Sequence, residues 1–319
     1  MTYRIAILEK VNREGINFYL SDLIVDDLTD LPLRKVLDII ENYEVIIIKS
    51  RTNINKEFFD HAKNLKIIAR AGIGLENINI DIAKENNIHI LSTPGANSIS
   101  TAEFTVSIML SLIKNLPEAF KRVEEYDFRR HLVEGREISE LTIGIIGLGR
   151  VGSNVARILS SFNCKTLGYD SSSNDLSLVK NYGVRIFEDL DQVLAKSDII
   201  TIHLPLRKEY LGKINKDKLS LMKKGSIIIN TSRGPIIEED SLLSLLDSGH
   251  ISKAALDVIT DEPVFDYNVK VNAHTKKLLE HPSVFYTPHM AASTIDAQRR
   301  ISHELAQKIH ELMKTIKNN

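Results

Sequence analysis

The stretch TIGIIGLGRVG, at residues 142–152, decides the fold of this 319-residue chain. Its apolar half predicts a buried parallel strand, and a segment with helical spacing, SNVARILSSF, follows it. Between them, Gly147 permits a tight turn, Gly149 lets the backbone approach a pyrophosphate, and Gly152 lets the helix pack closely on the strand. Free N–H groups at the start of that helix favour phosphate binding. The stretch therefore predicts a dinucleotide-binding turn.

The next apolar run, CKTLGYD, supplies the acidic partner that such a turn requires. It ends in Asp170, at about the ~20-residue separation expected of a ribose-binding carboxylate. Asp170 would accept hydrogen bonds from the 2′ and 3′ hydroxyls and repel a 2′-phosphate, so the pattern predicts NAD rather than NADP. The alternative is a Gly-rich turn in an ordinary α/β protein. Because strand, helix and acid fall in register, we favour the nucleotide site.

Composition indicates a globular protein large enough for two domains. The chain is 43% hydrophobic and 26% charged, with a net charge of −1, which gives no reason to expect a nucleic-acid or membrane partner. No apolar stretch approaches the ~20 residues that span a bilayer, and the N-terminus lacks the features of a signal peptide. A single cysteine excludes an intrachain disulfide. These features predict a cytoplasmic enzyme.

Apolar runs alternate with helical patterns along most of the chain. Four strand candidates precede residue 95 (YRIAIL, EVIIIK, LKIIAR, IHIL) and seven lie between 142 and 287. This alternation predicts an α/β fold with two doubly wound parallel sheets. A Gly-x-Gly turn at residues 71–74 lacks a third glycine, so we expect it to bind a small anion. The segment 98–114 is too apolar all round for a surface helix and is expected to be buried between domains or subunits.

Three predicted strands of the second half end in polar clusters, IIINTSRGP, ALDVITDEP and VFYTPHMAAST. Ligands of open α/β sheets bind at the carboxyl ends of strands. A bidentate cation such as Arg233 suits a substrate carboxylate, an imidazole such as His289 suits a hydroxyl proton, and Glu262 suits the orientation of that base. Each residue also has an ordinary interpretation, as an ion pair, a hydrogen-bonded loop residue or a solvated turn residue. The residues alone leave these alternatives open.

The motifs GLGRVG, NTSRGPIIEEDSLL, AALDV, DEP and TPHMAAST closely resemble those of the D-2-hydroxyacid dehydrogenases, over about residues 45–305. The resemblance implies that Arg233 binds the substrate carboxylate, Glu262 holds the imidazole and His289 is the acid/base. It also implies a Rossmann NAD-binding domain at 98–289, inserted in a flavodoxin-like substrate-binding domain formed by 1–97 and 290–319. The implied cofactor contacts are Gly147, Gly149, Arg150, Val151, Gly152, Asp170, Leu204, Pro205, Thr231, Ser232, Asp257 and Ala291.

Within the family, IIIKSRTNIN, ARAGIGLENIN and STPGANSISTAEFT are most similar to the D-3-phosphoglycerate dehydrogenases. A phosphorylated substrate needs cations away from the catalytic histidine, and Lys49, Arg51 and Arg70 fall at two strand ends near the 72–74 loop. Solvated edge charges are the alternative interpretation. Ile73 stands where the subgroup commonly has a hydroxyl residue. The expected substrate-binding residues are Lys49, Arg51, Arg70, Gly72, Ile73, Gly74 and Asn97.

The resemblance implies NAD-dependent oxidation of D-3-phosphoglycerate to 3-phosphohydroxypyruvate, the first step of serine biosynthesis, by a short form without a C-terminal regulatory domain. It also implies a homodimer formed through the helix at 98–114. One alternative is a glyoxylate/hydroxypyruvate reductase or D-lactate dehydrogenase that uses the same triad on an uncharged tail. Another is an NAD-sensing corepressor-like binding protein. No metal site is expected, since His250, His274 and His281 show no metal-ligand spacing.

Overall fold

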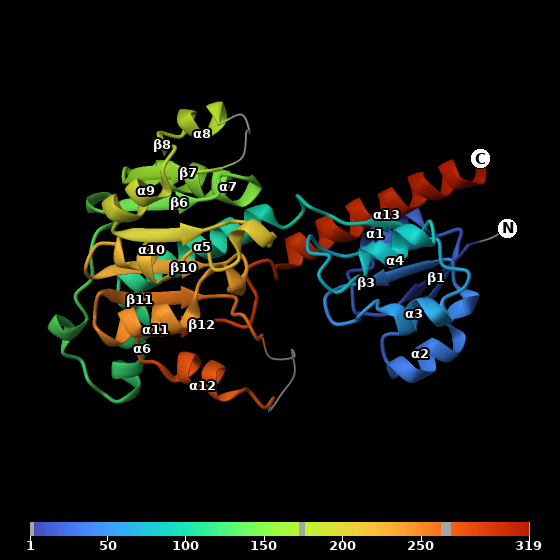
Figure 1. Cartoon of the computed structure of the whole chain (residues 1–319), viewed down its shortest axis with the longest axis horizontal. Coiled ribbons are helices and arrows are strands. Elements are labelled where there is room, and N and C mark those ends of the chain that lie inside the picture. Colours follow the sequence, from blue (N-terminus) through green and yellow to red (C-terminus); the bar gives the residue numbers. More distant parts are fainter. Residues whose placement is uncertain (1–2, 172–175, 263–268, 319) are drawn as a thin grey trace. The chain divides into compact units, whose positions relative to one another are not determined.

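The structure is a computed structural model that describes residues 3–171, 176–262 and 269–318. The chain divides into two compact units, unit 1 (residues 1–97 and 293–319) and unit 2 (residues 98–292) (Figure 1). The second boundary lies three residues beyond the expected position, 289/290. The physical reason is that Met290 and Ala291 donate backbone hydrogen bonds to Asp257, which keeps this turn with unit 2.

Unit 1 is built on a parallel sheet which, over the described residues, has five strands in the order β2-β1-β3-β4-β5. This order is the flavodoxin-like one expected from the sequence. The strands are β1 (Arg4–Ile7), β2 (Ile24–Asp27), β3 (Val45–Ile48), β4 (Ile67–Arg70) and β5 (His89–Leu91). Strand β3 is fully buried, which explains its continuous apolar run.

Strand β2 was absent from the sequence prediction. Its sequence, IVDD, offers only two apolar residues, and it pairs with a single neighbour, β1, at the edge of the sheet. An edge strand buries less of its surface, so its apolar signal is weak.

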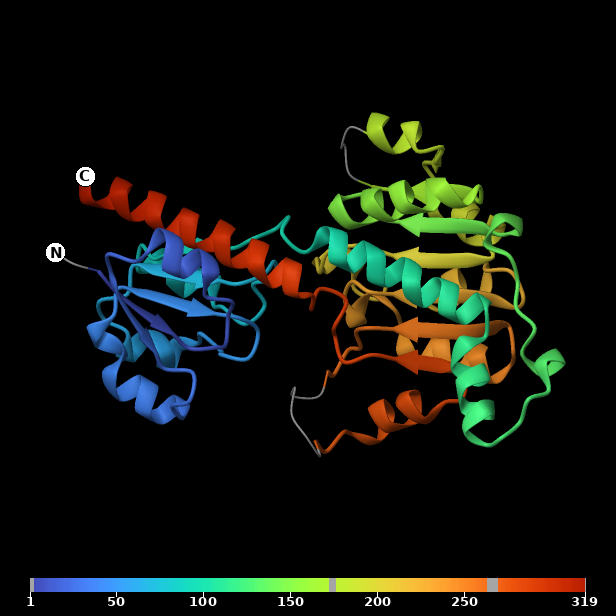
Figure 2. The ribbon, with the colours of Figure 1, turned by 180° about the vertical axis from the view of Figure 1, so that it is seen from behind.

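Helices cover both faces of the unit 1 sheet (Figures 1 and 2). Helices α1 (Glu14–Tyr19) and α13 (Ile295–Asn318) cover one face. The other face is covered by α2 (Leu33–Ile39), α3 (Lys56–His61) and α4 (Ile80–Glu85). A Cβ at Gly15 of α1 would lie 2.4 Å from the backbone of His303 in α13. Glycine is therefore required where these two helices meet.

Unit 2 is built on a second parallel sheet with, among the described residues, seven strands in the order β12-β11-β10-β9-β6-β7-β8. Counted within the unit this is the Rossmann order 3-2-1-4-5-6 with one further strand, so the predicted fold class is confirmed. The strands are β6 (Thr142–Ile146), β7 (Lys165–Tyr169), β8 (Arg185–Phe187), β9 (Ile199–Ile202), β10 (Ser226–Asn230), β11 (Ile251–Leu256) and β12 (Val284–Tyr286). All seven predicted strands of this region are present.

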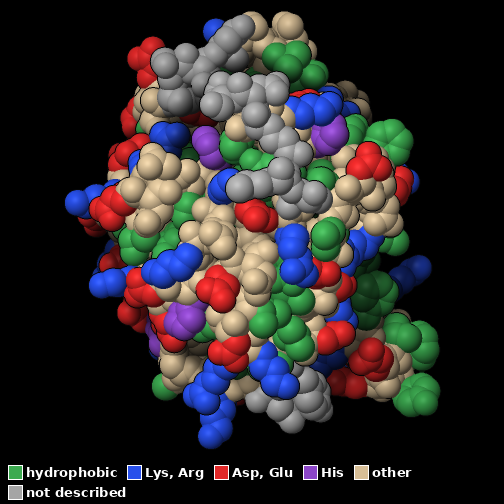
Figure 3. Space-filling view, turned by 90° about the vertical axis from the view of Figure 1, so that its right-hand side faces the viewer, with side chains coloured by type: hydrophobic (Ala, Val, Ile, Leu, Met, Phe, Trp, Pro, Cys, Tyr) green, Lys and Arg blue, Asp and Glu red, His purple; other side chains and the backbone are tan. Residues whose placement is uncertain are grey.

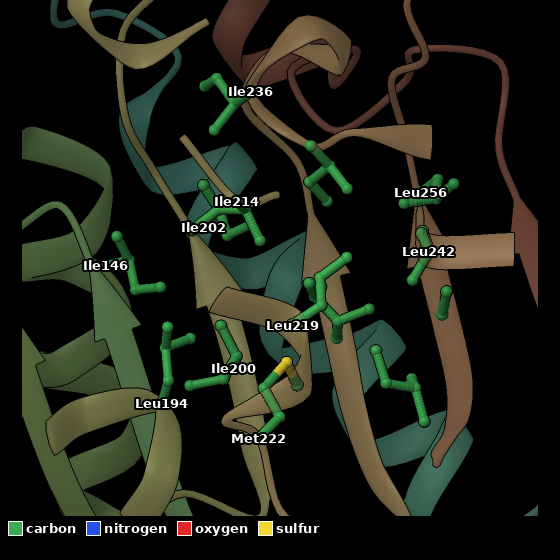
Figure 4. Close-up of a cluster of buried hydrophobic side chains, with 14 of the residues drawn as sticks. Ile146, Leu194, Ile200, Ile202, Ile214, Leu219, Met222, Ile236, Leu242 and Leu256 are labelled. Atoms are coloured by element: carbon green, nitrogen blue, oxygen red, sulfur yellow. The ribbon is translucent and has the colours of Figure 1, made fainter. Parts of the chain in front are cut away.

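Two apolar clusters, one on each face, hold helices against this sheet. On one face lie α5 (Ser98–Ile113), α7 (Arg150–Leu159) and α8 (Ser177–Asn181). On the other lie α9 (Leu190–Lys196), α10 (Lys216–Ser220), α11 (Glu239–Asp247) and α12 (Ala273–Glu280). Figure 4 shows part of the second cluster, with Ile200 and Ile202 of β9 beside Leu194 of α9 and Leu219 of α10.

The surface carries charges of both signs. On the face shown in Figure 3, Lys and Arg side chains are interspersed with Asp and Glu side chains. Such a mixture creates no extended field of one sign on that face. Over the described ranges, no helix combines the length and the apolar character needed to cross a bilayer.

Candidate functional site

The glycine turn lies between β6 and α7 in unit 2. Gly147 has φ of +91°, a backbone conformation that side chains disfavour. A Cβ at Gly152 would lie 1.9 Å from the Gly147 carbonyl oxygen, whereas one at Gly149 would meet nothing within 4 Å. Gly149 is the N-cap of α7, and no side chain caps this helix, which begins with Arg150 and Val151. The turn therefore presents helix N–H groups to open space, as a phosphate site requires.

Asp170 follows β7 and lies directly beside this turn. Its Oδ2 accepts a hydrogen bond from the backbone N–H of Leu148 at 2.6 Å, and the side chain is half-buried. A carboxylate in this place suits ribose hydroxyls and disfavours a 2′-phosphate. The open cradle at Gly149, the uncapped helix start and this carboxylate together fit a dinucleotide such as NAD.

Residues after β9 border the turn as well. A Cβ at Gly147 would lie 2.7 Å from the carbonyl oxygen of His203, so glycine permits the close approach. Leu204 is buried and Pro205 is exposed. The His203 Nε2 lies 3.0 Å from Thr201 Oγ1, and burial lowers the pKa of His203 to about 3. The ring is therefore neutral, and it is the backbone of His203 that borders the turn.

The turn that presents Arg233 follows β10 and is held by Asn230, a buried residue that the sequence analysis missed. Asn230 Oδ1 accepts from the Ser232 N–H at 3.0 Å and from the Ser232 hydroxyl at 2.7 Å, and its Nδ2 donates to the Arg233 carbonyl at 2.9 Å. Arg233 itself is half-buried, and its Nη1 donates to the Ser232 carbonyl. An Asn that ends an apolar run before a turn is the signal that was available.

Two further contacts fix the Arg233 turn within unit 2. The hydroxyl of buried Thr231, an expected cofactor contact, lies 2.9 Å from the hydroxyl of Thr105 in α5. A Cβ at Gly234 would lie 2.0 Å from the carbonyl carbon of Ile259. Glycine therefore allows the Arg233 turn to touch the loop that follows β11 and contains Glu262.

The structure brings Glu262 and His289 together from the ends of β11 and β12. His289 Nδ1 lies 2.8 Å from Glu262 Oε2, and their side chains are 36% and 24% exposed. His289 has φ of +50°, in the left-handed region, and its N–H donates to the Thr287 carbonyl. A histidine in this conformation is uncommon and points to an imposed local geometry. The contact leaves Nε2 as the ring nitrogen turned away from Glu262.

Asp257 anchors the turn that presents His289. Its Oδ1 accepts from the Thr287 hydroxyl at 2.6 Å and from the Met290 N–H at 2.8 Å, and its Oδ2 accepts from the Ala291 N–H at 2.9 Å. Burial raises the pKa of Asp257 above its usual value, although these hydrogen bonds oppose the shift. The sequence analysis assigned Asp257 and Ala291 to the cofactor alone, because donors 30 to 34 residues along the chain are not visible in a motif.

In unit 1 the three expected cations lie at the carboxyl ends of β3 and β4. Lys49 Nζ donates to Gln298 Oε1 at 3.1 Å. Burial lowers the pKa of Lys49; the charge of Glu9 opposes the shift, and the charges of Arg70 and Arg51 add to it. These three cations therefore share one neighbourhood. Glu9, which follows β1, was not predicted.

The 72–74 loop lies beside this cation cluster. Gly72 has φ of +143°, and a Cβ there would lie 1.7 Å from Arg70 Nη1, so the guanidinium covers the loop at this glycine. The side chain of Ile73 is partly exposed, Gly74 is buried, and Asn97 ends the first segment of the unit half-buried.

The buried carboxylate of Glu9 organises the loop that carries two of the cations. It accepts hydrogen bonds from the backbone N–H groups of Lys49 at 2.9 Å, Thr52 at 3.0 Å and Arg51 at 3.2 Å. The side-chain Nε of Arg51 lies 3.6 Å from Glu9 Oε2. Burial opposes its ionisation, but the backbone bonds hold the pKa of Glu9 below its usual value. Glu9 ends an apolar run, the same signal that marked the strand ends of unit 2.

Within the ranges that the structure covers, no group of three or more His, Cys, Asp or Glu side chains is arranged to hold a metal ion.

Known proteins resemble this chain in sequence and in fold. The sequence model of the D-isomer specific 2-hydroxyacid dehydrogenase NAD-binding domain matches residues 106–291. The chain is 34% identical to D-3-phosphoglycerate dehydrogenase of Bacillus subtilis over 98% of its own length but only 57% of that protein. It is 34% identical to hydroxypyruvate reductase of Thermotoga maritima, over 96% of this chain and 97% of the relative.

The fold comparison agrees with the sequence comparison. A crystal structure of D-lactate dehydrogenase from Aquifex aeolicus, complexed with NAD and lactic acid, superposes with a TM-score of 0.84 at 29% identity, covering 99% of this chain and 98% of that one. The chain therefore belongs to the D-isomer-specific 2-hydroxyacid dehydrogenase family.

Proposed function

We propose that this protein is an NAD-dependent dehydrogenase that oxidises D-3-phosphoglycerate to 3-phosphohydroxypyruvate, the first step of serine biosynthesis. The contact of 2.8 Å between His289 and Glu262 carries the proposed reaction class, and the neighbourhood of Lys49, Arg51 and Arg70 carries the choice of a phosphorylated substrate. The contact lies in the unit that also contains the glycine turn and Arg233, which follows the neighbouring strand β10. Family membership and the similarity to D-3-phosphoglycerate dehydrogenases support it.

In the proposed reaction the residues of unit 2 divide three tasks. His289 takes the substrate hydroxyl proton at Nε2, because Nδ1 is engaged by Glu262. Glu262 fixes the ring orientation and stabilises the positive charge that the proton brings. Arg233 holds the substrate carboxylate through two parallel N–H donors. When bound, NAD supplies the acceptor for the hydride that leaves C2 of the substrate.

We assign unit 1 to substrate binding and its cation cluster to the phosphate. Lys49, Arg51 and Arg70 bring three positive charges into one neighbourhood, where the Glu9 carboxylate offsets part of that charge. A phosphate dianion is attracted by such a group of cations, and arginines bind it with paired donors. The backbone N–H groups of the 72–74 loop, beside this cluster, offer further donors to an anion.

A second candidate is a reductase of unphosphorylated 2-oxo acids, such as hydroxypyruvate or glyoxylate. Two observations favour it: Glu9 offsets part of the positive charge, and Gln298 already accepts a hydrogen bond from Lys49. The Thermotoga maritima hydroxypyruvate reductase also matches this chain over nearly the full length of both proteins. This candidate uses the same three residues of unit 2.

The proposal is tested by following NADH absorbance when purified protein is mixed with NAD and D-3-phosphoglycerate. We expect NADH to form with the D isomer, to form much more slowly with L-2-hydroxy acids, and to require NAD rather than NADP because of Asp170. No NADH formation with any D-2-hydroxy acid, in a preparation that binds NADH, would contradict the proposed reaction class.

We further propose that the protein forms a homodimer through α5 and its neighbours. Phe120 of α6 (Leu116–Glu124) is 66% exposed, and Tyr126 and Phe128 beyond it are 86% and 73% exposed. A groove of about 700 Å³, lined by residues that include Ile108 and Tyr286, lies in the same unit. Clustered exposed apolar side chains are typical of protein interfaces. Light scattering should give twice the 36.0 kDa chain mass, and a single-chain mass at micromolar concentration would refute the dimer.

A further inference from the structure

A second carboxylate lies behind the Glu262–His289 pair. Glu239 is the first residue of α11, and its side chain is 8% exposed. Its Oε1 accepts from the Thr260 N–H at 2.6 Å and from the Thr260 hydroxyl at 2.9 Å. Thr260 belongs to the loop after β11, two residues before Glu262. One oxygen of Glu239 therefore holds the loop that contains Glu262.

The other oxygen of Glu239 connects to a third segment. Oε2 lies 3.1 Å from Nε2 of His274 in α12, and His274 Nδ1 lies 3.2 Å from Oδ1 of exposed Asp240. With both of its oxygens engaged, Glu239 links the start of α11, the loop after β11 and the start of α12. We call Glu239, Thr260 and His274 the loop clasp.

The charge of Glu239 affects the pKa of Tyr286, a residue that is also influenced by Glu262 of the proposed catalytic pair. Burial raises the pKa of Tyr286 to about 12, and the negative charges of Glu262, Asp257 and Glu239 contribute to this rise. Three carboxylates thus contribute to the electrostatic environment of one tyrosine at the end of β12. Placing another buried carboxylate near Glu262 adds repulsion, so the hydrogen bonds in the loop clasp must outweigh that cost.

A comparison with the neighbouring Glu238 shows whether Glu239 only stabilises the start of α11 or also holds the loop after β11. An acidic residue at a helix N-terminus is ordinarily explained by the helix dipole, and Glu238 fits that explanation. Glu238 is exposed, and its carboxylate accepts from the Lys216 N–H and the Ser241 hydroxyl. Neither partner belongs to the loop after β11. Glu239 alone of these two adjacent acids holds Thr260.

We propose that Glu239 is a positioning residue, which fixes Thr260 and so keeps the Glu262 carboxylate at Nδ1 of His289. The inference rests on the proposed function of the Glu262–His289 pair. When the acceptor is removed, the Thr260 N–H and hydroxyl lose their partner and the loop relaxes to satisfy them elsewhere. Glu262 then loses its fixed place beside the imidazole. Substrate and cofactor contacts elsewhere stay intact, so the defect falls on turnover rather than on binding.

The kinetic test compares Glu239→Ala, Glu239→Gln and Glu238→Ala in the full-length protein, with NADH and hydroxypyruvate. We expect Glu239→Ala to lower kcat by about 10- to 100-fold with less than about a threefold change in the KM for NADH, within the range of a misplaced general acid. As pH rises, the reductase activity of Glu239→Ala should begin to decline at a lower pH than that of the wild type, because Glu262 no longer favours the protonated His289 ring. Glu239→Gln keeps an oxygen acceptor for Thr260 and should recover most of kcat. Glu238→Ala should lower the melting temperature and leave kcat and the pH profile unchanged.

A second readout does not depend on turnover. Ring signals of the ten histidines are followed by NMR as pH is varied, with His289 assigned from His289→Asn and Glu262→Gln as the reference. We expect the titration midpoint of His289 to fall in Glu239→Ala as it does in Glu262→Gln, and to stay unchanged in Glu238→Ala. If Glu239→Ala does not fold, Thr260→Val removes the hydroxyl alone and should move the midpoint in the same direction by less.

Two results would overturn the proposal in different ways. A Glu239→Ala protein with wild-type kcat and midpoint, when Glu262→Gln changes both, would refute the positioning role and leave the proposed function standing. A Glu262→Gln protein with unchanged kcat and midpoint would refute the pairing itself, and with it both the proposed mechanism and the role of Glu239.

Discussion

The strand ends of the two units bring together different kinds of charged side chain. In unit 1, Lys49, Arg51 and Arg70 share a neighbourhood with the Glu9 carboxylate. In unit 2, three carboxylates contribute to the environment of Tyr286, and one of them pairs with His289. An excess of cations suits the holding of an anion, whereas a surplus of carboxylates suits a group that must gain and lose a proton. In the proposed function, the same kind of sheet edge therefore serves two kinds of chemistry.

The anchors of these two regions make the contrast sharper. Glu9 and Asp257 are 4% and 2% exposed, and each accepts three hydrogen bonds from a loop that presents functional side chains. Burial works against ionisation in both. In Glu9 the effect of the hydrogen bonds is larger than that of burial, so its pKa is lowered. In Asp257 the effect of burial is larger, so its pKa is raised. A buried strand-end carboxylate can therefore either stabilise the fold by its charge or carry that charge at a cost.

The largest effect on turnover is expected from a substitution at the strand ends of unit 2. We expect His289→Ala to lower kcat by about 10³-fold, since it removes the proposed general acid/base. NADH binding, followed by fluorescence, should be retained, and His61→Ala on the exposed end of α3 is the matched control. Turnover within threefold of the wild type would remove His289 from the proposed chemistry.

The next effect is expected from the anion-binding side. Arg51→Ala should raise the KM for 3-phosphohydroxypyruvate by about 10- to 100-fold, the equivalent of one charged hydrogen bond, and hardly alter glyoxylate reduction. Arg34→Ala, an exposed arginine of α2, controls for the loss of a positive charge from unit 1. An equal effect of Arg51→Ala on both substrates would exclude Arg51 from a phosphate site.

Glu9→Gln tests the anchor whose charge favours folding. We expect a loss of about 2 kcal/mol in unfolding free energy at neutral pH, because an amide cannot accept all of the loop N–H groups. Since the folded-state pKa of Glu9 is lowered, its stabilisation is present above the ordinary pKa and is lost as pH falls through the folded value. Urea unfolding should therefore show a smaller difference from the wild type at about pH 4 than at about pH 7. A difference that does not vary with pH would contradict this role.

Asp257→Asn should show a pH dependence of opposite sign. Because the folded-state pKa of Asp257 is raised, its ionised form costs folding free energy at neutral pH, and that cost disappears as pH falls below the ordinary value. The unfolding free energy of the variant, relative to the wild type, should thus be more favourable at about pH 7 than at about pH 4. Parallel slopes for Asp257→Asn and Glu9→Gln would remove the distinction between the two anchors.

The strands of unit 2, most strands of unit 1 and the glycine turn could be predicted from the sequence, because each of them depends on residues that are close together in the chain. Buried parallel strands appear as continuous apolar runs, and the backbone of Gly147 and the packing of Gly152 follow from a short motif. Strand β2 was missed because an edge strand needs few apolar residues. The residues Arg233, Glu262 and His289 could be named as candidates because each follows a recognisable strand end.

The residues that hold these groups in place could not be predicted in the same way. Asn230 acts on its own turn, and its position before that turn was a local signal that went unused. Asp257 and Glu239 bond to partners that lie 21 to 35 residues away in the sequence, so only the fold shows these partners. Glu9 reaches the loop after β3, 40 to 43 residues away. Their identity as acids was visible, but their role depended on which chain segments the sheet brings together.

The most direct test of the proposed function is the ratio of kcat/KM for 3-phosphohydroxypyruvate to kcat/KM for hydroxypyruvate, both measured with NADH on the wild-type protein. These substrates differ only in the phosphate, so the ratio isolates what the cation cluster of unit 1 contributes. Two charged hydrogen bonds to the phosphate predict a ratio of at least about 100. A ratio near or below one would contradict the assignment of Lys49, Arg51 and Arg70 to a phosphate and favour a reductase of unphosphorylated acids.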